Sequence, residues 1–374
     1  MLAVVALVAL AAGLAAGARR AIDPAAQQGQ QQRHPGADRA PDASGPPRTA
    51  SQPRRGRDPV RLAGSLVLLR FTGRRAPAYV LRALRAGRAA GVTLFADNVA
   101  GPAQVRALTA TLQRAAGGDA LIATDQEGGA VRQLPFAAPA AAPPSLATPA
   151  AAGAASRATA RDLRGVGVNV NLAPVADLPD GPVVGGRAFP GPGPPAVAAL
   201  VRAWVRGARA GGVAPTAKHF PGLAGAAENT DDAQVTIDRP PRPGLVPFRA
   251  AAAAGVPLVM VGHALYPQID PVHIASQSAA VLRLLRDDVG FSGVAVTDSL
   301  EAEAVVSRSQ VDVAALRSLR AGVDLLLTTG QGSYLRVLRR VSGAITASPA
   351  DRARATQASR RVAALRRTLA RRGP

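Results

Sequence analysis

Cysteine is absent from the 374-residue chain, and aromatic residues make up only 3% of it. Without cysteine the protein has no disulfide, no thiolate ligand for zinc and no cysteine nucleophile. Histidines number four, so the composition points to no histidine-rich metal site, and we expect neither a metal nor a cofactor. The scarcity of aromatic rings leaves no stacking platform for bases, which argues against specific nucleic-acid binding.

Lysine is almost missing as well. Lysine and arginine total 45 residues against 24 acidic ones, for a formal net charge of +21, yet Lys218 is the only lysine. The arginines are scattered, so we expect no more than loose attraction to an anionic cell envelope. The lone lysine, beside His219, is either an accident of an arginine-rich composition or a position that needs a compact ammonium where a planar guanidinium does not fit.

The N-terminus begins with an uninterrupted apolar run over residues 2–18. The run is shorter than the roughly 20 residues of a membrane-spanning helix, and it ends in Ala-Gly-Ala, which fits a signal-peptidase site. Two arginines follow the run instead of preceding it, the reverse of the usual order. We expect residues 1–18 to be a signal peptide, or an N-terminal anchor if uncleaved, and the protein to be exported, extracytoplasmic or secreted.

Residues 19–60 and 61–374 differ sharply in pattern. The first segment is rich in Gln, Pro, Arg and Gly and lacks apolar periodicity, which predicts a disordered linker. In the second, short apolar runs alternate with longer amphipathic ones, which implies buried strands in a parallel sheet covered by helices. Eight such units predict a single α/β domain, a (β/α)8 TIM-type barrel. The predicted strands cover residues 64–71, 91–96, 120–124, 167–173, 213–218, 256–262, 293–297 and 323–328.

Two further patterns concern packing. Val362, Leu365 and Leu369 keep helical spacing in the arginine-rich C-terminal stretch, which predicts a closing helix with a basic outer face. Trp204, the only tryptophan, lies in a predicted helix, and we expect it in the core.

Ionisable residues follow four of the predicted strands. A TIM barrel carries its active site at the carboxyl ends of its strands, so these residues are expected to meet at one rim. An aspartate after a strand is also a common helix N-cap, but this explains single positions better than four strands that deliver charged groups together. The residues are Asp125 and Glu127 after the third strand, Lys218 and His219 at the fifth, His263 after the sixth and Asp298 after the seventh.

Five stretches together resemble glycoside hydrolase family 3, over roughly residues 61–370. They read ATDQEGGAV, NVNLAPVADL, VGGRAFPG, AKHFPG and GFSGVAVTDSL. The branch they resemble is that of the single-domain bacterial β-N-acetylhexosaminidases. The resemblance implies a retaining glycosidase for β-linked N-acetylglucosamine-type sugars, with a carbohydrate substrate such as cell-wall glycan fragments.

The resemblance also implies roles for individual residues. Asp298 matches the nucleophile, which forms a covalent glycosyl-enzyme in a retaining glycosidase. Asp125 matches the carboxylate that accepts hydrogen bonds from sugar hydroxyls. Arg187 matches a substrate-binding arginine, and Lys218 and His219 match the basic pair that holds the sugar.

Further expectations concern the remaining polar groups of this rim. A rotatable ammonium at Lys218 can bind hydroxyls while it balances Asp125 and Asp298. For Glu127, the alternative to a role in substrate binding is a structural role. His263 is expected either to bind substrate or to be a satisfied core histidine.

The sequence departs from the hexosaminidase branch where the leaving group is protonated. That branch carries Asp-Ser-His after the fifth strand, with the histidine as general acid/base, and here Asn229, Thr230 and Asp231 take those places. We expect Asp231 to replace the histidine as acid, with Asp232 and Glu228 as further candidates, since most glycosidases use a carboxylic acid. The same residues also suit a plain turn.

Three other positions differ from the branch. Leu223 and Gly225 stand where a His and an Asp are usual, and Ala130 stands where an Arg is usual, although Arg132 lies close by. Because the Asp-Ser-His motif is replaced, the alternative function is a catalytically impaired glycan-binding or envelope-associated protein on the same barrel.

Overall fold

The structure is a computed structural model that describes residues 58–239 and 242–371. The expected signal segment (1–18) and the expected linker up to residue 57 lie outside the described residues. Within the described part, none of the helices combines the length and the apolar character that crossing a membrane requires.

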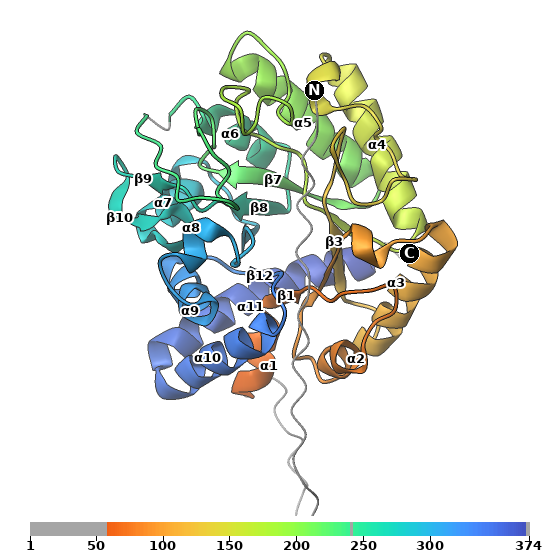
Figure 1. The fold of residues 1–374 in the computed structure, drawn as a ribbon, viewed down its shortest axis with the longest axis vertical. Helices are drawn as coiled ribbons and strands as arrows, with labels where there is room; N and C mark the ends of the chain where they lie inside the picture. Colours follow the sequence, from red (N-terminus) through yellow and green to blue (C-terminus); the bar gives the residue numbers. More distant parts are fainter. Residues whose placement is uncertain (1–57, 240–241, 372–374) are drawn as a thin grey trace, which may run out of the picture. The chain divides into compact units, whose positions relative to one another are not determined.

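The barrel prediction is confirmed. Eight parallel strands form one sheet in the order β11-β8-β7-β6-β3-β2-β1-β12, and a bridge between Val296 and Leu325 joins its first and last strands. Figure 1 shows these strands at the centre with the helices around them. The strands are β1 (Val67–Leu69), β2 (Gly91–Leu94), β3 (Leu121–Thr124), β6 (Val170–Asn171), β7 (Ala214–Phe220), β8 (Leu258–Val261), β11 (Val294–Thr297) and β12 (Leu326–Thr328).

Each strand is buried along its whole length, as the continuous apolar runs required. The fourth strand is much shorter than the expected 167–173. Backbone hydrogen bonds to β3 continue on either side of it, from the N–H of Asn169 to Ile122 and from that of Leu172 to Thr124. The Asn169 side-chain oxygen also accepts the Ile122 N–H at 2.8 Å, and Pro174 has no N–H to extend the ladder. β7 is longer than expected and carries the buried ladder to Phe220.

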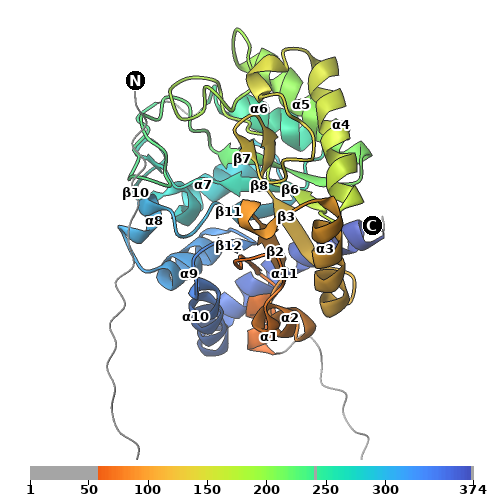
Figure 2. The ribbon, with the colours of Figure 1, turned by 45° about the vertical axis from the view of Figure 1, so that its right-hand side comes forward.

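Amphipathic helices surround the barrel (Figure 2). Trp204 is buried on α5 against Phe189, with ring centroids 5.7 Å apart. The predicted closing helix is α11, whose Val362, Leu365 and Leu369 are buried. The main helices are α2 (Ala78–Arg85), α3 (Pro102–Ala116), α4 (Pro149–Gly165), α5 (Pro194–Ala210), α6 (Leu245–Ala253), α7 (Ala279–Arg283), α9 (Val311–Ala321), α10 (Ser333–Ala347) and α11 (Pro349–Ala370).

Smaller elements complete the chain. A helix that the sequence pattern did not predict, α1 (Pro59–Gly64), precedes the first strand, with Asp58 as its N-cap. Short antiparallel pairs follow β3 and β8, and a single helical turn, α8 (Glu303–Val306), follows β11. The pairs are β4 (Gln126–Gly128) with β5 (Val131–Arg132), and β9 (Leu265–Tyr266) with β10 (Asp270–Ile274).

Candidate active site

The carboxyl ends of β3, β7 and β11 bring the sequence-predicted residues to one rim, as a TIM barrel requires. Lys218 lies at the centre of the charged groups and is only 2% exposed. Its Nζ lies 2.6 Å from Oδ1 of Asp125 and 2.6 Å from Oε1 of Glu127. The direct partners of the ammonium are thus these two carboxylates, whereas Asp298, expected as a partner, interacts with it only through charge.

Glu127 is structural, in line with the alternative stated for it. Its buried carboxylate also receives both Nε and Nη2 of Arg187, at 2.9 and 2.7 Å. This bidentate contact fixes the orientation of the guanidinium in addition to pairing its charge. Two cations and two anions therefore form one compact network, which is the condition under which buried charges are tolerated.

Protonation in this network follows from burial set against charge. Burial opposes ionisation of Glu127, but Lys218 and Arg187 outweigh it and lower the pKa of its carboxyl to about 2. Burial likewise opposes the charge on Lys218, but the two carboxylates prevail and raise the pKa of its ammonium. For Asp125 burial is the larger effect, and the pKa of its carboxyl is raised despite Lys218.

Asp298 stands beside His219 at the end of β11. Its Oδ2 lies 4.0 Å from Nε2 of His219, and its Oδ1 accepts the backbone N–H of Ser299 at 2.8 Å. Burial opposes ionisation, but the charges of His219, His263 and Lys218 outweigh it, and the pKa of Asp298 is lowered. The arrangement holds an ionised carboxylate at the rim of the barrel.

Asp177 is a site residue that the motif analysis missed. It is fully buried after β6, and its Oδ2 lies 2.8 Å from Nδ1 of His219. The available signal was positional, because Asp177 lies in the segment that leads away from the carboxyl end of the fourth strand.

The loop after β7 brings Asp231 to the same rim. The carbonyls of Thr230 and Asp231 accept the N–H groups of Ala304 and Glu303, each at 3.1 Å, so the loop docks on α8 just beyond Asp298. Residues 229–232 form the turn that their types suggested, since the Asn229 carbonyl accepts from the N–H of Asp232 at 3.0 Å. A turn here is compatible with Asp231 as the general acid, because the turn fixes the direction of the Asp231 side chain.

Asp231 is exposed, but its carboxyl is close enough to Asp298, His219 and His263 to interact with all three. Partial removal from water is the largest influence and the charge of Asp298 adds to it, so the pKa of Asp231 is raised. The exposure limits the size of this shift, while its direction suits a proton donor. Glu228 and Asp232 are exposed on either side of it.

His263 and Arg132 differ from the substrate-facing roles considered for them. His263 is fully buried, with Nδ1 2.8 Å from Ser276 Oγ and Nε2 2.9 Å from the Ser299 carbonyl. Both ring nitrogens are therefore occupied, and the satisfied core histidine is the better description. Arg132 donates to the carbonyls of Pro135 and Ala137 in its own loop, so it does not replace the arginine missing at Ala130.

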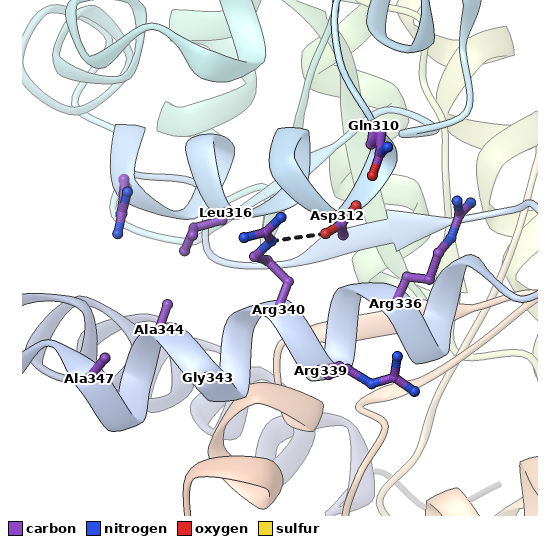
Figure 3. A pocket seen from close by; sticks show the side chains of 10 residues that line it. Gln310, Asp312, Leu316, Arg336, Arg339, Arg340, Gly343, Ala344 and Ala347 are labelled. Carbon is purple, nitrogen blue, oxygen red and sulfur yellow. Dashed lines mark hydrogen bonds and ion pairs between the residues drawn. The ribbon is translucent and has the colours of Figure 1, made fainter.

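Two cavities lie away from this rim. One of about 620 Å³ runs between α9 and α10, where Arg340 pairs with Asp312 across the groove (Figure 3). Another of about 840 Å³ is lined by residues that precede β3, β6 and β7, at the opposite end of the barrel. Barrel chemistry takes place at the carboxyl ends of the strands, so neither of these cavities is the candidate active site. Within residues 58–239 and 242–371, no three metal-ligating side chains gather in a way that suits an ion.

The sequence matches the family described as "Glycosyl hydrolase family 3 N terminal domain" over residues 65–365. A beta-hexosaminidase of Xanthomonas oryzae is 35% identical over 269 residues, which cover 68% of this chain and 80% of that protein. One from Stenotrophomonas maltophilia is 37% identical over 254 residues, or 64% of this chain and 75% of that protein.

Two solved structures have similar folds. A family 3 β-N-acetylglucosaminidase of Paenibacillus superposes on 84% of this chain with a TM-score of 0.79 and 32% sequence identity. The match covers 63% of that protein, which is less than two thirds of its length. A β-N-acetylhexosaminidase of Beutenbergia cavernae gives 0.76 at 32% identity, over 82% of this chain and 98% of that one.

Proposed function

Because the chain belongs to glycosyl hydrolase family 3, we propose that it is a retaining glycosidase that cleaves β-linked N-acetylglucosamine-type sugars, with Asp298 as nucleophile. It is a glycosidase by its family, since relatives named beta-hexosaminidase are 35% and 37% identical to it over aligned segments that cover 80% and 75% of their own length. The observation that carries the mechanism is the state of Asp298. Its pKa is lowered, and it lies 4.0 Å from His219 at the rim.

In the first step an Asp298 oxygen attacks the anomeric carbon while the bond from that carbon to the leaving oxygen breaks. Asp231 gives its proton to the leaving oxygen, so the alcohol departs neutral. In the second step water attacks the anomeric carbon, Asp231 takes a proton from that water, and the bond to Asp298 breaks. Both carboxyl groups return to their starting states.

Asp231 is assigned the acid/base role because its pKa is raised where that of Asp298 is lowered. Two titratable groups pushed apart in this way are the usual mark of an acid paired with a nucleophile. Retaining enzymes hold the two carboxyl groups about 5 to 5.5 Å apart, so the proposed mechanism requires the Asp231 carboxyl to come this close to that of Asp298.

The sugar is held by Asp125, Arg187, Lys218 and His219. Asp125 offers a carboxylate that is only partly exposed and is fixed by Lys218. Arg187 keeps its charge, because the bidentate contact with Glu127 raises its pKa against the effect of burial. The substrate class follows the relatives' names, and cell-wall glycan fragments are the natural source we propose.

The test is turnover of an activated aryl β-N-acetylglucosaminide, with retention read from the anomer formed first. Turnover by the wild-type protein, which retains Asp298, supports hydrolysis. Sugar binding without turnover, even on activated aryl glycosides, would favour the impaired glycan-binding alternative, which the missing Asp-Ser-His histidine motivates.

We also propose export, on the basis of the apolar run at residues 2–18 and its Ala-Gly-Ala end. N-terminal sequencing of protein recovered outside the cytoplasm should begin near residue 19. An intact N-terminus on membrane-bound protein points to an anchor, and protein confined to the cytoplasm contradicts export.

A further inference from the structure

The buried carboxylate of Asp177 lies behind the wall of the sugar site and is fully shielded from solvent. Its Oδ1 accepts the N–H of Leu223 at 2.8 Å, and its Oδ2 lies 2.8 Å from Nδ1 of His219. The backbone N–H of His219 lies 3.2 Å from both oxygens. Because every contact is with protein, Asp177 acts on the reaction only through the groups that it holds.

We propose that Asp177 is a positioning residue that fixes the tautomer and the direction of the His219 ring, an inference that rests on the proposed glycosidase function. An acceptor oxygen 2.8 Å from Nδ1 requires that this nitrogen carry a proton. Nε2 is then the nitrogen that faces Asp298, 4.0 Å from its Oδ2.

The distance between Nε2 of His219 and Oδ2 of Asp298 leaves room for a substrate group between them, so the orientation of the ring affects substrate binding. A separation of 4.0 Å is too long for a direct hydrogen bond, but a hydroxyl oxygen fits about 2.8 Å from both atoms. A sugar hydroxyl at that point contacts the histidine and the nucleophile together. The tautomer decides whether neutral Nε2 accepts from that hydroxyl or donates to it.

The same carboxylate also anchors the loop that carries the proposed acid. Leu223 is buried at the start of this loop, and its N–H is bonded to Asp177, while Thr230 and Asp231 dock on α8 further along. Asp177 therefore ties the sugar-binding histidine and the base of the acid-bearing loop to one point.

Asp177→Asn tests the proposal because asparagine keeps the size but only one acceptor. The N–H groups of Leu223 and His219 need that acceptor, so the carboxamide oxygen faces them and its NH2 faces Nδ1 of His219. Nδ1 must then accept, which moves the ring proton to Nε2. We expect nitrogen-15 NMR to show a protonated Nδ1 in the wild type and an unprotonated one in Asp177→Asn, with kcat/KM reduced about 10- to 100-fold.

Asp180→Asn is the matched control, since Asp180 lies three residues further on and pairs with Arg239 in an exposed ion pair. Such pairs contribute little, so both readouts should stay at wild-type values. A double-mutant cycle supplies the second test. In a His219→Gln background, Asp177→Asn should lower kcat/KM by no more than about threefold further, because both changes act through one ring.

An unprotonated Nδ1 in the wild type overturns the proposal, and so does an Nδ1 proton that survives in Asp177→Asn. Fully additive losses in the double-mutant cycle overturn it as well. The wild-type NMR measurement needs neither turnover nor a folded variant. If the wild type binds sugar and turns over no glycoside, the proposed function fails, while the protonation state of His219 still decides the role of Asp177.

Discussion

The ammonium of Lys218 lies 2.6 Å from a carboxylate oxygen of Asp125 and 2.6 Å from one of Glu127. The chain's only lysine is thus a buried cation shared by two anions, in a protein with arginine at every other basic position. A compact ammonium can meet two carboxylates and still turn a donor towards substrate, which a planar guanidinium of greater volume does less well. The lone lysine has a physical reason.

Lys218→Arg should weaken sugar binding and lower the free energy of unfolding by about 1 to 3 kcal/mol, because the larger head group overfills a packed site. Calorimetric titration with N-acetylglucosamine and urea unfolding measure the two effects. Arg239→Lys, at an exposed ion pair, is the control and should change neither beyond about 0.5 kcal/mol. Unchanged sugar binding in Lys218→Arg would show that the site does not require a lysine at this position.

Glu127 should make stability depend on acid pH. Its pKa is about 2 in the folded protein against 4.5 for the ordinary group, so its ionised form stabilises the fold above pH 4.5. That contribution, on the order of 3 kcal/mol, is lost as the pH falls from 4.5 towards 2. Urea unfolding at several pH values should show a shallower acid loss in Glu127→Gln than in the wild type, whereas Asp180→Asn should keep the full loss.

Asp298→Ala should reduce kcat by about 10⁴-fold or more while leaving the fold intact, because it removes the nucleophile. Circular dichroism checks the fold. A fluorinated sugar with an activated leaving group should trap the intermediate on Asp298 in the wild type, as read by peptide mass spectrometry. A label on Asp125 would contradict the assignment.

The pH profile of kcat/KM should be bell-shaped. Asp298 has to be ionised, and since its pKa is lowered from 3.8, activity is lost only as the pH falls below that value. Asp231 has to be protonated, and since its pKa is raised from 3.8, activity is lost as the pH rises above its shifted value. Asp231→Asn should abolish the alkaline limb and leave the acid limb in place, whereas an unchanged alkaline limb would place the proton donor elsewhere.

Asp231→Ala should slow turnover of glycosides with poor leaving groups by about 10² to 10⁴-fold, the usual contribution of general acid catalysis. Activated aryl glycosides need little protonation and should suffer less, and added azide should restore turnover by attacking the intermediate without help from a base. Asp232→Ala and Glu228→Ala are the matched changes on either side. Loss of turnover in one of these instead would move the acid to that residue.

Much of the architecture could be predicted from local pattern. Strand and helix periods are set by neighbouring residues, so the eight strands and the rim positions of Asp125, Lys218 and Asp298 follow from short windows of sequence. The burial of Trp204 and the closing helix α11 follow in the same way. The barrel then requires that residues after its strands meet, whatever their separation along the chain.

Which of these side chains pair was decided only by the tertiary structure. Glu127 binds Arg187 across 60 positions of sequence, and Asp177 holds His219 across 42. Motif spacing suggested Asp298 as a partner of Lys218 and a substrate contact for His263, but the ammonium reaches Glu127 and the histidine is saturated by Ser276 and the Ser299 carbonyl. The reason is physical: local sequence fixes where a strand ends, whereas a hydrogen bond depends on side-chain direction and on the balance of burial against charge among distant residues.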